Sequence, residues 1–187
     1  MAQAAGLSRF PPGNPDRPTA PEGLAAEGIA LRPAVAQDLT FLRRLYGSFR
    51  AEELAQVPWP ARTKESFLDE QFALQHQHFV THYPRADFLV LERARAPIGR
   101  FYLDRTPPHH LIVDIGFLPD WRGRGLGVAL IAQTKALARA AGAQGVELHV
   151  APNNPGARRL YERLGFRAVG LTGTHAKLQW PAAAIFR

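Results

Sequence analysis

The chain has 187 residues, of which 23 are basic and 16 are acidic, so its formal net charge at pH 7 is +7. This length suits one domain, and 46% hydrophobic residues are enough for a buried core. The absence of cysteine excludes disulfides, thiolate zinc sites and cysteine nucleophiles. No apolar run is long enough to span a bilayer, and the first ten residues lack the basic and apolar regions of a secretory signal. We therefore expect a cytoplasmic, soluble protein.

The positive charge comes almost entirely from arginine, because the only lysines are Lys64, Lys135 and Lys177. The planar guanidinium suits phosphate and carboxylate groups. The charge is therefore compatible with binding of nucleic acid, a membrane surface or a small polyanionic cofactor. The arginines are scattered and form no run of five or more, so a solvated basic surface explains them equally well.

Residues 1–27 carry five prolines between positions 11 and 21, among small residues with little apolar periodicity. Such a segment is expected to bury too little surface to offset its ordering entropy. We predict a flexible N-terminal tail over 1–27 and one domain over 28–187.

Beyond Gly28, strand-like and helix-like patterns alternate. The pattern predicts strands at 29–31, 88–91, 98–103, 110–118, 146–151, 166–171 and 176–180. It predicts helices at 39–49, from Thr63 to the residue before Pro84, at 125–141 and at 155–164. The resulting order, β-α-α-β-β-β-α-β-α-β-β, is typical of an α/β (α+β) domain with a mixed sheet.

The most informative segment runs from Asp114 to Val128: a buried strand, a proline turn, alternating glycines and arginines, and an amphipathic helix. Glycine lets the backbone approach a ligand closely, and a helix N-terminus offers free N–H groups and the positive end of the helix dipole. The pattern therefore predicts an anion site that suits phosphate. The alternative interpretation is a tight turn with two solvent-facing arginines. Neither the Walker motif nor the three-glycine dinucleotide fingerprint is present.

A second group of residues, from Asn153 to Phe166, predicts a capped helix. Asn154 suits the N-cap, Pro155 the first helical position and Gly165 the left-handed position after the helix. Capping does not explain Tyr161, which lies on the helix face directed toward the core, where a phenol needs a polar partner.

These two segments together resemble the signatures of the GCN5-related N-acetyltransferases (GNAT family). Arg122-x-x-Gly125-x-Gly127 resembles the first signature, and Asn154-x-x-Ala157-x-x-x-Tyr161-x-x-x-Gly165-Phe166 resembles the second. They occur in the family's order, separated by one helix and one strand. The resemblance covers residues 28–180 and implies a single acyl-CoA N-acyltransferase domain that uses acetyl-CoA as co-substrate.

The resemblance also implies a role for each matching position. Tyr161 would protonate the leaving thiolate, and Asn154 would lie beside the pantetheine arm. The backbones of Phe117 and Leu118 would pair with that arm. The pyrophosphate would be held by the backbone N–H groups of the loop, namely Arg122, Gly123, Arg124, Gly125, Leu126 and Gly127. The acceptor would be an amine, bound between the segment 49–62, which contains Trp59, and the segment 172–177.

A protonated amine must lose a proton before it can attack, so a base or a water chain is expected. Asp114 is our first candidate, and a strand-end carboxylate paired with an arginine is its alternative interpretation. Glu147 and His149 share one face of their strand, as a proton relay or simply as a polar face. His76, His78 and His82 favour a solvated helix face over a metal site, because no third ligand is evident beside the i, i+4 pair.

The predicted function is direct acetyl transfer from CoA to an amine of an unidentified small molecule or protein. The alternatives are a regulatory module that binds nucleic acid, which the Arg-Gly-Arg-Gly sequence suggests, and a CoA-binding protein without catalysis. We expect neither a membrane nor a nucleic-acid partner, and the sequence is compatible with a homodimer.

Overall fold

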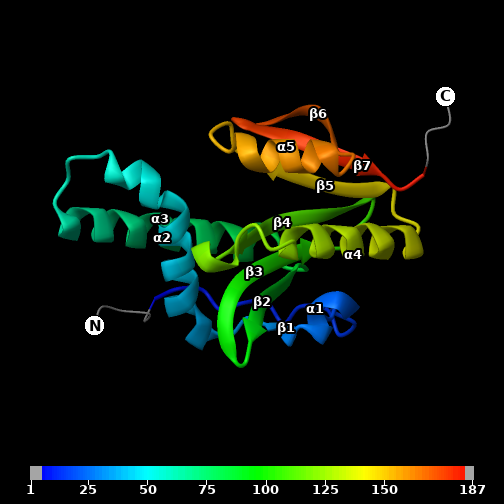
Figure 1. Ribbon diagram of the computed structural model, residues 1–187, viewed down its shortest axis with the longest axis horizontal. Coiled ribbons are helices and arrows are strands. Elements are labelled where there is room, and N and C mark those ends of the chain that lie inside the picture. Colours follow the sequence, from blue (N-terminus) through cyan, green and yellow to red (C-terminus); the bar gives the residue numbers. More distant parts are fainter. Residues whose placement is uncertain (1–5, 184–187) are drawn as a thin grey trace.

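The computed structural model describes residues 6–183, and seven strands within them form one sheet in the order β1-β2-β3-β4-β5-β7-β6 (Figure 1). β4 and β5 pair in parallel, and the other neighbouring strands pair antiparallel. The mixed sheet predicted from the element order is confirmed. The strands are β1 (Ile29–Pro33), β2 (Asp87–Arg93), β3 (Ala96–Asp104), β4 (His109–Phe117), β5 (Gly145–Val150), β6 (Arg167–Thr172) and β7 (His175–Pro181).

The helices are α1 (Glu22–Ala26), α2 (Leu39–Ala55), α3 (Ala61–His82), α4 (Leu126–Ala140) and α5 (Pro155–Arg163), with 3-10 turns η1 (Ala36–Asp38) and η2 (Pro119–Trp121). The predicted helix at Thr63 in fact begins at Ala61, because the carbonyl of Pro60 accepts the amide of Lys64. Among these helices, none is both long and apolar enough to cross a bilayer in the described part of the chain.

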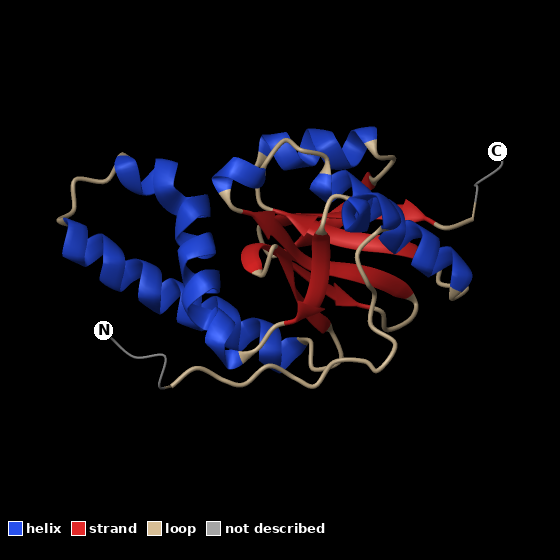
Figure 2. Ribbon diagram, turned by 60° about the horizontal axis from the view of Figure 1, so that its bottom comes forward, coloured by secondary structure: helices blue, strands red, loops and turns tan. Residues whose placement is uncertain are grey.

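Two hydrophobic cores lie on opposite faces of the sheet, because successive strand residues point to opposite sides. Leu89 and Leu91 of β2 join the core beneath α1, α4 and α5, whereas Phe88 and Val90 join the core beneath α2 and α3. Figures 1 and 2 show α2 and α3 extending together to one side of the sheet. The ring of Phe49 in α2 lies so close to Gly116 of β4 that a Cβ at Gly116 would collide with it.

The N-terminal segment is ordered against the domain over residues 6–27, which differs from the flexible tail expected there. Asn14 donates from its backbone N–H to Oδ1 of the buried Asp87 at 3.0 Å, and Arg105 bonds both Asp16 and Asp87. Phe10 packs on His76 and Phe88, and Leu24 of α1 is buried in the core. Residues 1–5 lie outside the described residues.

This difference has a physical cause. Between residues 6 and 21 the segment has no helix or strand of its own, and its apolar side chains and polar groups contact α3 and β2, which are far away in sequence. The composition indicates the entropy cost of ordering such a segment, but it gives no sign of these long-range contacts.

Candidate active site

The glycine segment forms an open turn at the start of α4. Gly123 and Gly125 have left-handed φ angles of 71° and 80°, and Gly125 is the N-cap residue. A Cβ at either glycine would meet no atom within 4 Å, and no side chain caps the helix. The first amides of α4 have no intrahelical acceptor and no side-chain cap, and amides of this kind bind phosphate.

The two arginines of this turn have different surroundings. Arg122 folds back onto the protein. Its Nε donates to the carbonyl of Phe117 at 3.0 Å, and its Nη2 donates to Oγ of Ser48 at 2.8 Å. Its guanidinium carbon lies 5.3 Å from the ring centre of Phe49. Arg124 lies over the ring of Trp121 at 5.0 Å. Arg122 thus ties the turn to α2 and β4, and Arg124 stays exposed at the turn.

β4 and β5 separate beyond Ile112. Residues 109–112 of β4 pair with residues 145–148 of β5, and no pairing follows. In the pairing of β3 with β4, Tyr102 lies opposite Asp114 and Leu103 lies opposite Ile112. Val113 is therefore an extra residue without a partner in β3. This bulge bends β4 and leaves the edge that faces β5 without backbone partners from that strand.

The expectation for Leu118 is not met, because its amide donates to the carbonyl of Ile98 in β3 at 2.9 Å. Backbone groups of alternate strand residues point to opposite sides. Those of Ile115 and Phe117 therefore point to the open edge, and those of Leu118 do not. The backbone of Phe117 thus faces the open edge, and its carbonyl oxygen already accepts a hydrogen bond from Arg122.

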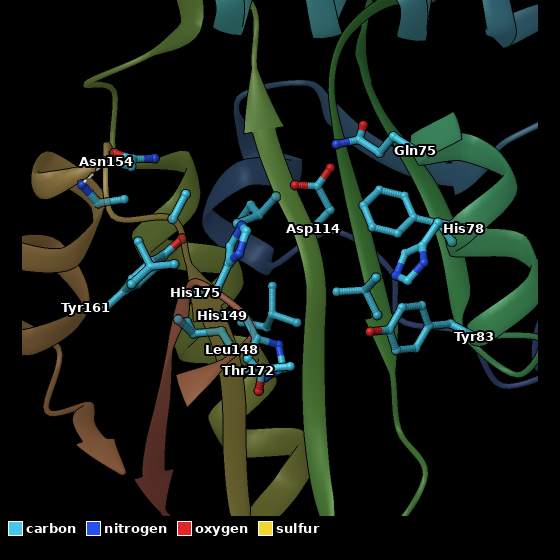
Figure 3. Close-up of a pocket in the computed structure, with 17 residues that line it drawn as sticks. Gln75, His78, Tyr83, Asp114, Leu148, His149, Asn154, Tyr161, Thr172 and His175 are labelled. Atoms are coloured by element: carbon cyan, nitrogen blue, oxygen red, sulfur yellow. Dashed lines mark hydrogen bonds between the residues drawn. The ribbon is translucent and has the colours of Figure 1, made fainter. Parts of the chain in front are cut away.

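A cavity of about 520 Å³ lies at this separation, and residues from both faces of the sheet line it. Figure 3 shows Asn154 and Tyr161 on one side, Gln75, His78 and Tyr83 on the other, and Asp114 between them. The remaining lining residues include Ile115, Ala157 and, toward the β6–β7 hairpin, His149, Thr172 and His175. Residues from α3, β4, β5, α5 and the hairpin thus meet at one cavity.

Tyr161 is held by the capped helix that the sequence predicts. Oδ1 of Asn154 accepts the amide of Ala157 at 3.1 Å, and Gly165 ends the helix with φ of 84° so that Phe166 packs edge-on against Tyr161. Burial, together with the charge of Asp114, raises the pKa of Tyr161 to about 12. The hydroxyl is therefore protonated at neutral pH and can act as a proton donor.

Asp114 forms an ion pair with Arg100, a residue that sequence analysis did not single out. The side chain of Arg100 is 2% exposed, lies among the rings of Phe49, Phe79 and Tyr102, and donates to Oε1 of Gln75 at 2.9 Å. The paired carboxylate that was the alternative interpretation of Asp114 is thus present. One signal was available: Arg100 interrupts an otherwise apolar strand.

Glu147 and His149 lie on the face of β5 opposite to Leu148. Glu147 accepts from Nζ of Lys177 at 2.9 Å and from Nε2 of Gln179 at 2.8 Å. Burial favours the neutral acid, but these two bonds outweigh it and lower the pKa of Glu147. Of these four polar residues, only His149 lines the cavity in the described part of the chain.

The three histidines of α3 have different surroundings. His76 is 3% exposed and its Nε2 lies 2.7 Å from the carbonyl of Ser8, so the solvated face expected there is wrong at this position. The rings of His78 and His82 stack at 4.2 Å, and His78 also lines the cavity. Over residues 6–183 no cluster of three or more potential ligands is arranged to hold a metal ion.

The expected acceptor region is placed only in part. Thr172 and His175 line the cavity, but the 49–62 segment does not, and the exposed Trp59 packs on Phe67 instead. The C-terminal half of α3 takes the place assigned to that segment, through Gln75, His78, Phe79 and Tyr83.

Residues 49–166 match the acetyltransferase (GNAT) family. Uncharacterized N-acetyltransferase MJ1207 of Methanocaldococcus jannaschii is 47% identical over 58 residues, which are 31% of this chain and 24% of that protein. Uncharacterized N-acetyltransferase YycN of Bacillus subtilis is 32% identical over 74 residues, which are 37% of this chain and 47% of that protein. The matches thus span a quarter to a half of these curated relatives.

Among solved structures, the PaiA N-acetyltransferase of Thermoplasma acidophilum in complex with coenzyme A aligns with a TM-score of 0.62 at 16% identity. The alignment covers 82% of this chain and 98% of that one, so the two share a fold. The family match includes both the open turn before α4 and the helix that carries Tyr161. The chain belongs to the GNAT acetyltransferase family.

Proposed function

We propose that this chain transfers the acetyl group of acetyl-CoA directly to the nitrogen of an amine. The observation that carries the proposal is the cavity at the separation of β4 and β5, with Tyr161 on one face of the sheet and His149 on the other. A donor and an acceptor that enter from opposite faces would meet there.

The chain's residues fit coenzyme A in three respects. The open amides after Gly123 and Gly125 suit a pyrophosphate, and the basic surface favours a polyanion. The backbone edge at Ile115 and Phe117 suits the amides of a pantetheine arm, beside Asn154. The PaiA relative was solved with coenzyme A, which supports the same ligand here.

Acetyl-CoA supplies an acetyl group that is activated as a thioester. Tyr161 holds a proton on its hydroxyl oxygen at neutral pH and is placed to donate it to a departing thiolate. The turn fixes the ligand's phosphates, and the cavity walls orient the amine. Because the chain contains no cysteine, no acetylated thiol of the protein is required.

The test is acetyl transfer from labelled acetyl-CoA to a panel of amines: spermidine, a lysine-containing peptide, a peptide with a free N-terminus, an aminoglycoside and a free amino acid. We expect at least one acceptor to gain a single acetyl group, detected by mass, with release of one free thiol per acetyl group. Thiol release without acetylation of any amine, or binding of CoA without turnover, would contradict the proposal.

A further inference from the structure

We propose that His149 takes the proton from the acceptor amine and that Glu147 is its positioning residue. This inference rests on the proposed acetyl transfer and assigns the base of that reaction. It comes from a half-buried imidazole whose Nε2 atom is buried and has no hydrogen-bond partner among the described residues.

The two nitrogens of the His149 ring have different surroundings. Nε2 is buried, has no hydrogen-bond partner and lies 3.6 Å from Oε1 of Glu147, just beyond hydrogen-bond distance. We assign a proton to Nε2, directed at this carboxylate. Nδ1 then carries the lone pair available to an amine in the cavity that His149 lines.

Glu147 is itself held in place. Lys177 and Gln179 both bond its Oε2 atom, and this leaves Oε1 toward His149. A fixed carboxylate beside an imidazole selects the tautomer and stabilises the imidazolium that forms when the ring accepts a proton. Asp114 is less suited to this task, because the buried guanidinium of Arg100 neutralises it.

His149 is neutral at pH 7 mainly because burial lowers its pKa. The charge of Glu147 partly opposes this, and Lys177 and His175 of β7 lower the pKa further. The other ionisable groups at the cavity are His78 of α3, Tyr83 just after α3, Asp114 of β4 and Tyr161 of α5. A neutral imidazole can accept a proton at neutral pH, whereas an imidazolium cannot.

The proton step balances as follows. The N–H bond of the ammonium breaks and its electron pair stays on nitrogen, which becomes the nucleophile. The bond that forms is Nδ1–H of His149, and the imidazolium later releases this proton to solvent. After the attack, the nitrogen loses a second proton to solvent. Tyr161 gives its proton to the departing thiolate and regains one from solvent, so that one proton is released overall.

The activity test compares His149→Gln with wild type on the best amine of the panel between pH 6 and pH 10. Glutamine keeps a polar side chain but cannot take a proton. We expect kcat to fall about 100-fold or more at pH 7 with little change in KM. The deficit should narrow as pH approaches the amine's own pKa of about 10.4, where free amine is already present. The matched control is His109→Gln, at the far end of β4 and outside the cavity lining, which should behave as wild type.

The second readout needs no acceptor. In an NMR titration of the wild-type protein, the His149 ring should titrate below 6.5 and carry its proton on Nε2 when neutral. Glu147→Gln should move the pKa lower still, because it removes the charge that raises it.

The outcomes separate this inference from the proposed function. If wild type acetylates no amine, the proposed function fails, and the titration alone then decides on His149. A His149 pKa at or above 6.5, or one that Glu147→Gln leaves unchanged, overturns the inference. So does a His149→Gln deficit that is constant over the pH range, since a purely structural role would produce it.

Discussion

Replacing Asp114 by Asn removes the negative charge from the ion pair with Arg100 while keeping the shape of the side chain. Arg100 is 2% exposed and its Nε has no hydrogen-bond partner, so the pair with Asp114 is its principal compensation for burial. Removing one partner of a buried pair costs about 3–5 kcal/mol. Asp114 is 23% exposed and the Asn oxygen still accepts a hydrogen bond, so we expect the low end, about 3 kcal/mol.

For a chain of this size each kcal/mol shifts the melting temperature by roughly 2–4 °C, so Asp114→Asn should lower it by about 6–12 °C. The assay is urea unfolding followed by fluorescence, with calorimetry for the melting temperature. The double variant Arg100→Met/Asp114→Asn is the matched control, and it should recover part of the loss because it leaves no unpaired buried charge. A change below about 0.5 kcal/mol in the single variant would show that the pair is not structural.

Two further predictions concern the N-terminal segment and the proton donor. Deleting residues 1–27 should lower the free energy of unfolding by several kcal/mol. Burial of Leu24 alone contributes about 1.5–3 kcal/mol, and loss of Asn14 leaves Asp87 with fewer hydrogen-bond partners. An unchanged urea midpoint would contradict the packing of this segment. Tyr161→Phe should reduce kcat by about 10²–10⁴-fold with little change in stability, since the ring keeps its packing on Phe166. Unchanged turnover would remove Tyr161 from the mechanism.

The features that sequence predicted well are those that local chemistry determines. The left-handed glycines of the turn before α4 and the Asn154 cap of α5 depend on residues within a few positions, so their spacing is enough to place them. The alternation of strands and helices gave the mixed sheet for the same reason.

The features that sequence missed depend on register or on distant partners. The bulge at Val113 decides which residues of β4 face the open edge, and this excludes the amide of Leu118. The pairing of Asp114 with Arg100 follows from the alignment of β3 with β4. The order of residues 6–27 follows from contacts with Asp87, Arg105 and the core, and none of these has a local signal.

Binding of the coenzyme A phosphates by the turn before α4 is best tested by a thermal-shift assay. The assay compares two variants whose substituted glycines have similar backbone φ angles. Gly125→Glu places an anion at the open turn, and Gly142→Glu places the same charge at the other end of α4. Both glycines have positive φ, 80° and 66°, and both have open space around them, so both variants should lose similar stability.

At about 100 times its Kd, coenzyme A should stabilise the wild type by about 2.7 kcal/mol, which corresponds to a rise in melting temperature of roughly 5–11 °C. Coenzyme A should give the same rise for Gly142→Glu and none for Gly125→Glu. No rise in the wild type, or a full rise in Gly125→Glu, would contradict phosphate binding at this turn.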